Sequence, residues 1–187
     1  PTPSNPRATA EAFLQARMID TTSLNFSQGS VFEKGKTYPT VKVVFDGVSF
    51  ERLIDYKGSN KTRLSTYKGK HYETKGVQEA KQVYVVEGIF DALALAQAGL
   101  PAIATLSSTH NPESCFKEGV NYILGFDNDC AGIKAVKKFK TYLNEHDISF
   151  SVQLPPLGSD WNDLLLSGAL SEDMQVDTLA LCRWRGN

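Results

Sequence analysis

The segment VYVVEGIFDALALAQAG, Val83 to Gly99, is followed 24 residues later by ILGFDNDCAG, Ile123 to Gly132. Each segment begins with an aliphatic run, reaches one or more carboxylates, and then continues at helical spacing. Such strand–helix units predict a parallel sheet whose strands end along a common edge. We therefore expect Glu87, Asp127 and Asp129 to gather at the carboxyl ends of two strands.

Carboxylates that meet at one edge of a sheet repel one another unless a cation lies between them. Hard oxygen ligands of this kind favour Mg²⁺, and open parallel sheets bind ligands outside the carboxyl ends of their strands. Asp127 and Asp129 alternate along an extended segment, which predicts that both side chains point to the same side. The alternative is that one of the two only caps the following helix. The pattern indicates metal-assisted chemistry on phosphates.

Three further acids follow predicted strands and have ordinary structural explanations as well. Asp91 lies one helical turn after Glu87, where an acid also interacts favourably with the helix dipole. In GSDWNDLL, Gly158 to Leu165, Asp160 and Asp163 have the spacing of a helix cap and a capping box. Because this is the third carboxylate group to follow a strand, we also count these acids as candidate metal ligands.

The composition is that of an ordinary globular protein, with 41% hydrophobic and 22% charged residues in 187. No apolar run approaches the roughly 20 residues of a membrane span and no signal peptide is visible, so we expect a cytoplasmic protein. Cys115, Cys130 and Cys182 are odd in number and far apart, which indicates neither a zinc site nor a disulfide framework. We expect His71 and His110 to be surface or loop residues.

Charge divides the chain into a basic and an acidic part. Residues 1–82 carry 13 Lys/Arg and 8 Asp/Glu, whereas residues 83–187 carry 7 and 13. This arrangement would suit a protein that holds a polyanion near a metal site, although uneven surface charge without a function is the alternative. The first residue is not methionine, so we expect the chain to be part of a longer protein.

The pattern of predicted secondary structure changes at Val83. Before it, residues 8–20 predict a helix capped by Thr9 or Thr2, Asp46-Gly47 predicts a hairpin, and residues 57–82 predict an irregular linker. After it, strands are expected at 83–87, 101–105, 121–127 and 148–154, and helices at 90–98, 113–118, 131–146 and 161–167. These elements predict an α/β fold in three parts: a small α+β subdomain (1–82), a parallel sheet flanked by helices (83–170), and a tail (171–187) with a terminal helix near Trp184.

Residues 83–168 resemble a Toprim domain, the metal-binding fold shared by DnaG-type primases, type IA and II topoisomerases and OLD-type nucleases. VVEGIFDALAL resembles the primase form of the first motif, FDNDCAGIKA the second, and SDWNDLL the third acidic motif of phage and plasmid primases. TLSST, Thr105 to Thr109, departs from the pattern because Ser107 stands where bacterial primases usually have glycine. The resemblance implies the RNA-polymerase catalytic core of a DnaG-type DNA primase of bacterial, phage or plasmid type.

The front half then resembles the rest of that core. AFLQARMID resembles its opening helix, whose family pattern has glycine where Ala16 or Met18 stands. FERLIDYKGSNKTRLSTYKGK, Phe50 to Lys70, resembles its basic strand region, which faces nucleic acid or nucleotide. The residues that this implies as nucleic-acid-binding or nucleotide-binding are Arg52, Lys57, Lys61, Arg63 and Lys68. A solvated surface is the alternative explanation for these charges.

The resemblance implies an enzyme that joins ribonucleotides or deoxynucleotides on a single-stranded DNA template. Glu87 would position the attacking hydroxyl, Asp127 and Asp129 would hold Mg²⁺, with Mn²⁺ as a substitute, and the remaining ligands would be Asp91, Asp160 and Asp163. The expected partners are the template, NTPs or dNTPs, and a helicase, a single-strand-binding protein or a separate zinc-binding module, with no membrane. Two alternatives remain open: a Toprim nuclease, and a non-catalytic single-strand-binding replication module.

Overall fold

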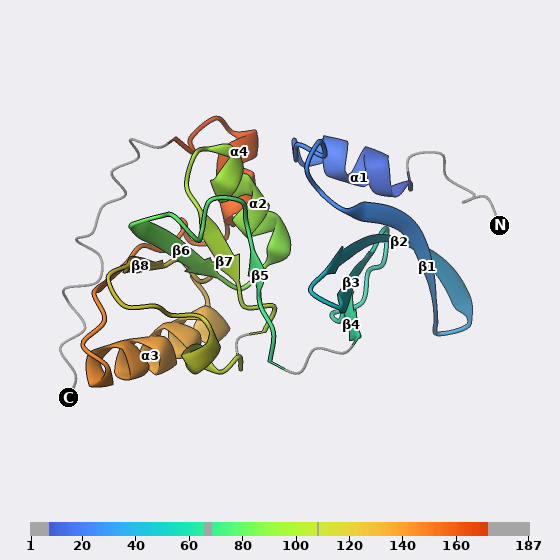
Figure 1. Ribbon diagram of the computed structural model, residues 1–187. Helices are drawn as coiled ribbons and strands as arrows, with labels where there is room; N and C mark the ends of the chain where they lie inside the picture. Colours follow the sequence, from blue (N-terminus) through green and yellow to red (C-terminus); the bar gives the residue numbers. More distant parts are fainter. Residues whose placement is uncertain (1–7, 66–68, 108, 172–187) are drawn as a thin grey trace. The chain divides into compact units, whose positions relative to one another are not determined.

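The computed structural model describes residues 8–65, 69–107 and 109–171 of the chain. The chain divides into two compact units, Pro1–Lys70 and His71–Asn187 (Figure 1). Lys68 and the terminal helix predicted near Trp184 lie outside the described residues. None of the helices in the described ranges has the length and apolarity that a membrane span requires.

The first unit is a four-stranded antiparallel sheet with one helix. Its strands follow the order β1-β2-β3-β4. The elements are α1 (Ala10–Ala16), β1 (Phe26–Glu33), β2 (Lys36–Phe45), β3 (Val48–Leu53) and β4 (Thr62–Ser65). Helix α1 packs against β1 and β2, and Leu14 from the helix and Val41 from β2 are fully buried. This unit is the small α+β subdomain that the sequence predicts.

Two tight turns set the register of this sheet. Asp46 and Gly47 join β2 to β3 with φ of 43° and 75°, which confirms the predicted hairpin. Lys34 and Gly35 join β1 to β2 in the same way, with φ of 49° and 79°. Both turns therefore have positive φ at both central residues, as a two-residue type I′ hairpin turn requires.

Helix α1 is shorter than the predicted helix over residues 8–20. Thr9 caps it as expected, because its hydroxyl accepts a hydrogen bond from the Ala12 N–H at 3.1 Å. At the other end Met18 adopts φ of 54°, and the Ile19 N–H donates to the Leu14 carbonyl. These contacts form a Schellman motif, which ends the helix one turn early.

The second unit is a five-stranded sheet covered by helices on both faces. Its strand order is β5-β7-β6-β8-β9, in which β6, β7, β8 and β9 are parallel and β5 is antiparallel to β7. The strands are β5 (Tyr72–Glu73), β6 (Gln82–Val86), β7 (Ala102–Ala104), β8 (Asn121–Leu124) and β9 (Phe150–Val152). The helices are α2 (Ile89–Gln97), η1 (Pro112–Ser114, a 3₁₀ turn), α3 (Cys130–Glu145) and α4 (Trp161–Leu166). The predicted α/β class is confirmed.

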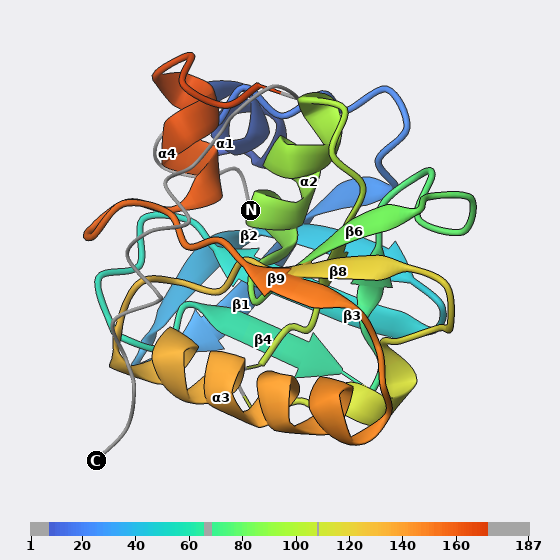
Figure 2. The ribbon, with the colours of Figure 1, turned by 90° about the vertical axis from the view of Figure 1, so that its left-hand side faces the viewer.

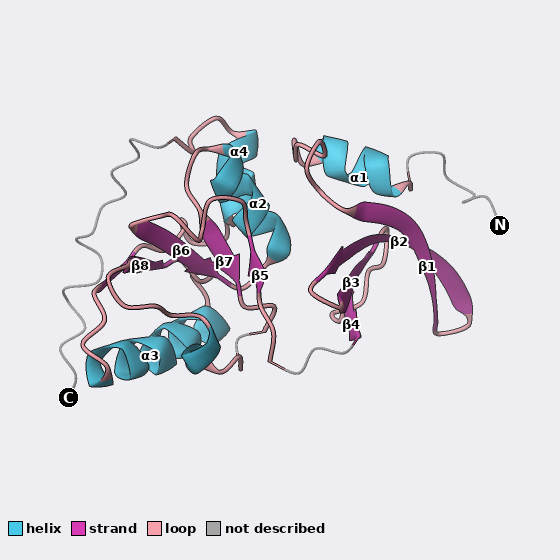
Figure 3. Cartoon of the chain, in the orientation of Figure 1, coloured by secondary structure: helices cyan, strands magenta, loops and turns pink. Residues whose placement is uncertain are grey.

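The helices cover the sheet as two separate layers. In Figures 2 and 3, α2 and α4 lie together on one face, while α3 lies on the opposite face. Because neighbouring residues of a strand point to opposite faces, Val83 and Val85 pack in the core beneath α3 with Phe139, whereas Tyr84 contacts Trp161 of α4. The near-continuous apolar composition of β6 reflects this burial on both sides.

Two local predictions in this region were wrong. Residues 113–118 do not form an α-helix, because Pro112 begins a single 3₁₀ turn that ends at Cys115. The segment 57–82 is not an irregular linker throughout, since it contains β4 and β5. The two units divide between Lys70 and His71 rather than at 82/83, because β5 hydrogen-bonds to β7 and joins the second sheet.

Met18 provides a test of how α1 ends. Helices α2 and α4 use Gly99 and Gly168 at the equivalent left-handed position, where an L side chain costs about 1–2 kcal/mol. Met18 is 53% exposed and loses little packing when it is shortened. We expect Met18→Gly to raise the free energy of unfolding of the first unit by about 1 kcal/mol in urea titrations. Met18→Ala, which keeps the strain, should leave it nearly unchanged; equal effects of both variants would contradict this explanation.

Candidate functional site

Two neighbouring parallel strands deliver the principal carboxylates to one edge of the second sheet. Glu87 follows β6 directly, and Asp127 follows β8 after Gly125 and Phe126. The side chains of Glu87 and Asp127 are half-buried, whereas Asp129 is exposed. The strand ends therefore place these acids at the edge where parallel sheets bind ligands, as the sequence predicts.

Gly132 allows helix α3 to begin directly against the backbone of Asp127. A Cβ atom at Gly132 would lie 1.9 Å from the Asp127 carbonyl oxygen. Any residue with a side chain would therefore clash with this carbonyl unless the backbone moved. Glycine is therefore required here for close packing and not for an unusual φ. The contact holds Asp127 in the turn between β8 and α3.

Asp129 is the N-cap of α3. Its Oδ1 accepts hydrogen bonds from the N–H groups of Ala131 and Gly132, both at 2.8 Å. The capping interpretation of one aspartate in this pair is thus confirmed for Asp129. These hydrogen bonds use one carboxylate oxygen and leave Oδ2 for another ligand.

Asp160 and Asp163 cap α4 reciprocally. The Asp163 N–H donates to Asp160 Oδ1 at 2.7 Å, and the Asp160 N–H donates to Asp163 Oδ2 at 3.2 Å. This confirms the predicted capping box. As with Asp129, the box occupies one oxygen of each carboxylate.

Trp161 anchors the start of α4 beneath the strand ends. Its side chain is fully buried, and its indole Nε1–H donates to the Gly125 carbonyl at 2.6 Å. The ring also packs edge-on against Tyr84, with centroids 5.6 Å apart. Asn128 adds a second connection, because its Nδ2 donates to the Pro155 carbonyl at 3.2 Å. These contacts bring Asp160 toward the turn that carries Asp127.

Asp91 connects α2 to α4. Its Oδ1 accepts a hydrogen bond from the Asn162 N–H at 3.3 Å, and Asn162 is fully buried. Asp91 lies in the first turn of α2, where an acid also complements the helix dipole. The residue therefore has a structural role in addition to its position beside Glu87.

Asp127 is repelled electrostatically by two of the other predicted ligands. Burial raises the pKa of Asp127, and the negative charges of Asp129 and Asp160 raise it further. At neutral pH the charged form of such an acid lowers the stability of the folded state. A divalent cation would offset that cost, so the donor set fits a hard metal ion.

The predicted carboxylate ligands do not converge closely enough to bind one ion directly. Within the described residues, no three of the predicted acids have ligand atoms within 4.8 Å of one another. Direct binding of one ion by three of them therefore needs side-chain rotation, or bridging water molecules, which Mg²⁺ commonly retains.

The loop after β7 runs beside Glu87 in a strained conformation. Leu106 has φ of 64°, and its N–H donates to the Glu87 carbonyl at 2.9 Å. Of the described residues in this loop, Leu106 rather than Ser107 has the left-handed conformation that glycine would favour. A strained backbone next to the predicted catalytic glutamate is typical of functional sites.

The predicted basic residues of the first unit do not share one surface. Arg52 pairs across the sheet with Thr62, and Arg63 pairs with Glu51, so Arg52 and Arg63 point to opposite faces. The Arg63 guanidinium forms an ion pair with Glu33 and donates to the Thr62 carbonyl at 2.8 Å. Lys57 and Lys61 are exposed in the segment between β3 and β4.

Sequence reasoning missed several residues that shape this part of the molecule. Trp161 and Asn162 are fully buried, and a tryptophan between two capping acids was the available signal for the first of them. His110 lies in the loop between β7 and η1, as expected for a surface or loop residue, but it is 2% exposed, and His71 is half-buried. The His110 Nε2 lies 3.0 Å from the Ser114 hydroxyl of η1.

Asp127→Asn tests the acidic site. An acid with a raised pKa destabilises the folded state above that pKa, so this variant should unfold at a higher temperature than wild type at pH 7 with EDTA. Mg²⁺ at ten times its dissociation constant should stabilise wild type by about 1.4 kcal/mol and the variant much less. Thermal unfolding with and without Mg²⁺ measures both effects.

Asp147→Asn is the matched control, because Asp147 lies at the other end of α3. It should keep the full response to Mg²⁺. An equal response to Mg²⁺ in wild type and Asp127→Asn would show that Asp127 is not a ligand.

Comparisons with known proteins agree with this geometry. A family model described as Toprim-like matches residues 84–165. A DNA primase of Thermotoga maritima is 35% identical over 97 residues, which are 49% of this chain and 17% of that protein. The uncharacterized protein MG010 of Mycoplasma genitalium is 34% identical over 90 residues, 45% of this chain and 41% of its own length. The chain thus spans less than half of these curated relatives.

Solved structures share the fold over most of the chain. The Aquifex aeolicus primase structure of zinc-binding and RNA polymerase domains matches 89% of this chain and 54% of that one, with a TM-score of 0.66 and 19% identity. The RNA polymerase domain of Mycobacterium tuberculosis primase DnaG matches 86% and 59%, with a TM-score of 0.52 and 20% identity. Residues 84–165 are therefore similar to Toprim-like domains, and the chain has the fold of the primase RNA polymerase domain.

Proposed function

We propose that this chain is the catalytic core of a DNA primase, which joins nucleotides on a single-stranded DNA template. The observation that carries the proposal is the position of Asp127 after β8, with Asp129 and Asp160 at the starts of α3 and α4; burial raises the pKa of Asp127, and the charges of Asp129 and Asp160 raise it further. The Toprim-like match and the primase fold support it. Clustered acids in this position suit phosphoryl chemistry, in which charge on the transferred group has to be stabilised.

The proposed roles of the acidic residues follow from their positions. Toprim domains generally bind metal, and Mg²⁺ when bound would offset the charge of the triphosphate and polarise its phosphorus. Asp127 and the second oxygens of Asp129 and Asp160 are the proposed ligands, with Asp91 and Asp163 completing the acidic surroundings. Glu87, at the end of the adjacent strand, would orient the attacking 3′ hydroxyl and accept its proton.

The partners follow from the same proposal. The core would bind single-stranded DNA and NTPs or dNTPs in the cytoplasm, together with a helicase, a single-strand-binding protein or a zinc-binding module on another part of the protein. Mn²⁺ would substitute for Mg²⁺. A Toprim nuclease, with water as the nucleophile, is the competing function for the same acids.

The decisive experiment combines the chain with single-stranded DNA, labelled NTPs and Mg²⁺ or Mn²⁺, and sizes the products. We expect labelled oligonucleotides longer than the supplied nucleotides. Asp129→Asn should lower the rate more than about 100-fold, which corresponds to about 3 kcal/mol of lost transition-state stabilisation. Shortened DNA without a need for NTPs would instead identify a nuclease. Neither product under either metal, with or without partner proteins, would leave only a binding role.

The exposed lysines between β3 and β4 test the template-binding part of the proposal. Lys57→Ala/Lys61→Ala should weaken binding of single-stranded DNA and lower its salt slope by about 1.4, since each phosphate contact on a single strand contributes about 0.7. Fluorescence anisotropy at several salt concentrations measures this change.

Lys134→Ala/Lys137→Ala is the control, because these two lysines are exposed on α3 in the second unit. An unchanged slope in the Lys57/Lys61 variant would show that these two lysines do not contact the DNA backbone. Arg63→Ala is unsuitable for this purpose, since the loss of its ion pair with Glu33 would disturb the sheet.

A further inference from the structure

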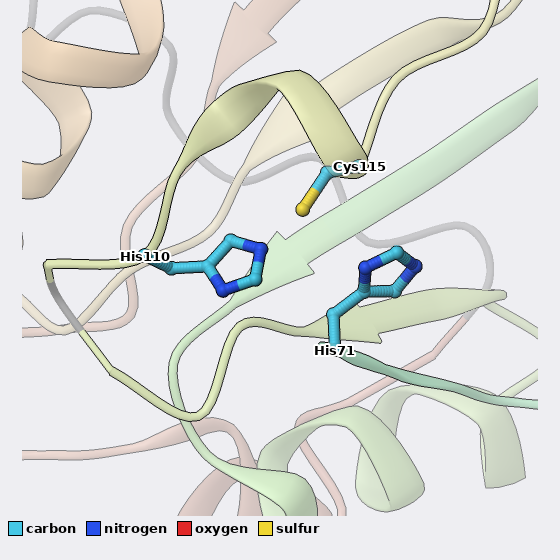
Figure 4. A group of neighbouring side chains, drawn as sticks. All are labelled: His71, His110 and Cys115. Atoms are coloured by element: carbon cyan, nitrogen blue, oxygen red, sulfur yellow. The ribbon is translucent and has the colours of Figure 1, made fainter. Parts of the chain in front are cut away.

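We propose that His71, His110 and Cys115 form a second metal site, suited to Zn²⁺ and built from residues other than the predicted carboxylate ligands. One ligand atom from each of the three side chains lies within 4.8 Å of the other two. Figure 4 shows the Cys115 sulfur and the two imidazole rings facing one another. The rings are nearly perpendicular, with centroids 6.0 Å apart, so they do not stack.

His71 presents an unused ligand atom to this group. Its Nε2 lies 2.9 Å from Glu73 Oε1, and its Nδ1 is buried without a hydrogen-bond partner. A carboxylate beside Nε2 favours the tautomer in which Nε2 carries the proton and Nδ1 has a free lone pair. A buried acceptor of this kind is costly unless something binds it. The carboxylate–histidine pair is the arrangement that orients histidine ligands of zinc.

His110 and Cys115 supply the other two ligands from a buried position. They are 2% and 4% exposed. Burial is the main reason that the pKa of His110 is lowered to about 4, so its ring is neutral and able to bind metal at pH 7. Burial raises the pKa of Cys115 to about 12, so the thiol is protonated at pH 7 and a bound ion has to displace its proton to solvent.

The charges around the three side chains are compatible with a cation. Zn²⁺ with one thiolate carries a net charge of +1, which the Glu73 carboxylate offsets. The positive charge of Lys138 opposes the binding of a cation. The Lys138 Nζ donates hydrogen bonds to the carbonyl oxygens of Thr109 and His110, at 3.0 and 2.7 Å. Glu73 is itself fixed, because its second oxygen accepts a hydrogen bond from Gln78.

The ligand types select the metal. Two imidazoles and one thiolate suit Zn²⁺, whereas Mg²⁺ prefers oxygen ligands. Bonds of about 2.0–2.3 Å place neighbouring ligand atoms of a tetrahedral zinc ion roughly 3.3–3.8 Å apart, so the observed spacing needs only a small inward movement. Three protein ligands leave the fourth position to a water molecule.

The site would join two segments that are distant in the sequence. His71 immediately precedes β5, and His110 and Cys115 flank η1, which follows the strained loop beside Glu87. A bound ion would therefore connect the edge strand of the sheet to the segment that follows this loop. Its expected effect is a more stable second unit, independent of the acidic site.

Cobalt substitution of the chelator-treated full chain tests the proposal. With excess Mg²⁺ present to occupy the carboxylates, one equivalent of Co²⁺ should produce a near-ultraviolet thiolate-to-cobalt band and visible bands of tetrahedral intensity. Zn²⁺ should abolish both bands by displacement and raise the unfolding temperature. Carboxylate-bound Co²⁺ produces no thiolate band, so failure of this site and failure of the acidic site are distinguishable.

Variants identify the ligands. Cys115→Ala should lose the thiolate band, and the matched control Cys130→Ala, at an exposed cysteine, should keep it. His71→Ala removes one ligand at a half-buried residue and should lose the tetrahedral bands, with folding confirmed by circular dichroism. Glu73→Gln should weaken Zn²⁺ binding by about 10–100-fold, whereas Glu79→Gln, at an exposed residue, should not.

Two results would overturn the site. The first is the absence of a thiolate band in the folded wild-type chain, which would show that the three side chains form an ordinary buried polar cluster. The second is a band that persists in Cys115→Ala, which would assign the thiolate to another cysteine.

Discussion

The concentration of negative charge at one edge of the second sheet is the constraint on which the site depends. Asp127 sits half-buried in the turn after β8; this burial raises its pKa, and the charges of Asp129 and Asp160 raise it further. The fold tolerates this repulsion because backbone N–H groups at the starts of α3 and α4 donate to Asp129 and Asp160. Each of these carboxylates is therefore oriented before any ligand arrives, and such preorganisation is what a site for charge stabilisation needs.

Capping and metal binding are compatible roles for the same carboxylates. The sequence presents them as alternatives, since a helix cap explains an acid without any function. In the structure the caps use Oδ1 of Asp129 and Oδ1 of Asp160, so that the second oxygen of each carboxylate remains for a ligand. A structural explanation for one oxygen is consequently no argument against a functional role for the whole side chain.

Much of the architecture was predictable because it depends on local patterns. The aliphatic run from Val83 to Val86, the Asp46-Gly47 turn and the acidic motifs each report a preference of a few adjacent residues, and the α/β class, the hairpin and the caps follow from them. The predictions that failed involve weak or misleading local signals. Residues 113–118 were predicted to be a helix, but the structure has a single 3₁₀ turn there, Pro112–Ser114.

The strands that precede Glu87 and Asp127 and the caps of α3 and α4 were predictable, because hydrophobic period and capping chemistry act over a few positions. Only the tertiary structure decided which distant residues meet. Trp161 lies beneath Gly125, and His71 faces His110 and Cys115, because β5 pairs with β7 and α4 packs against α2. Arg52 and Arg63 lie on opposite faces because of the register between β3 and β4. Such contacts depend on strand order and register, which no short stretch of sequence encodes.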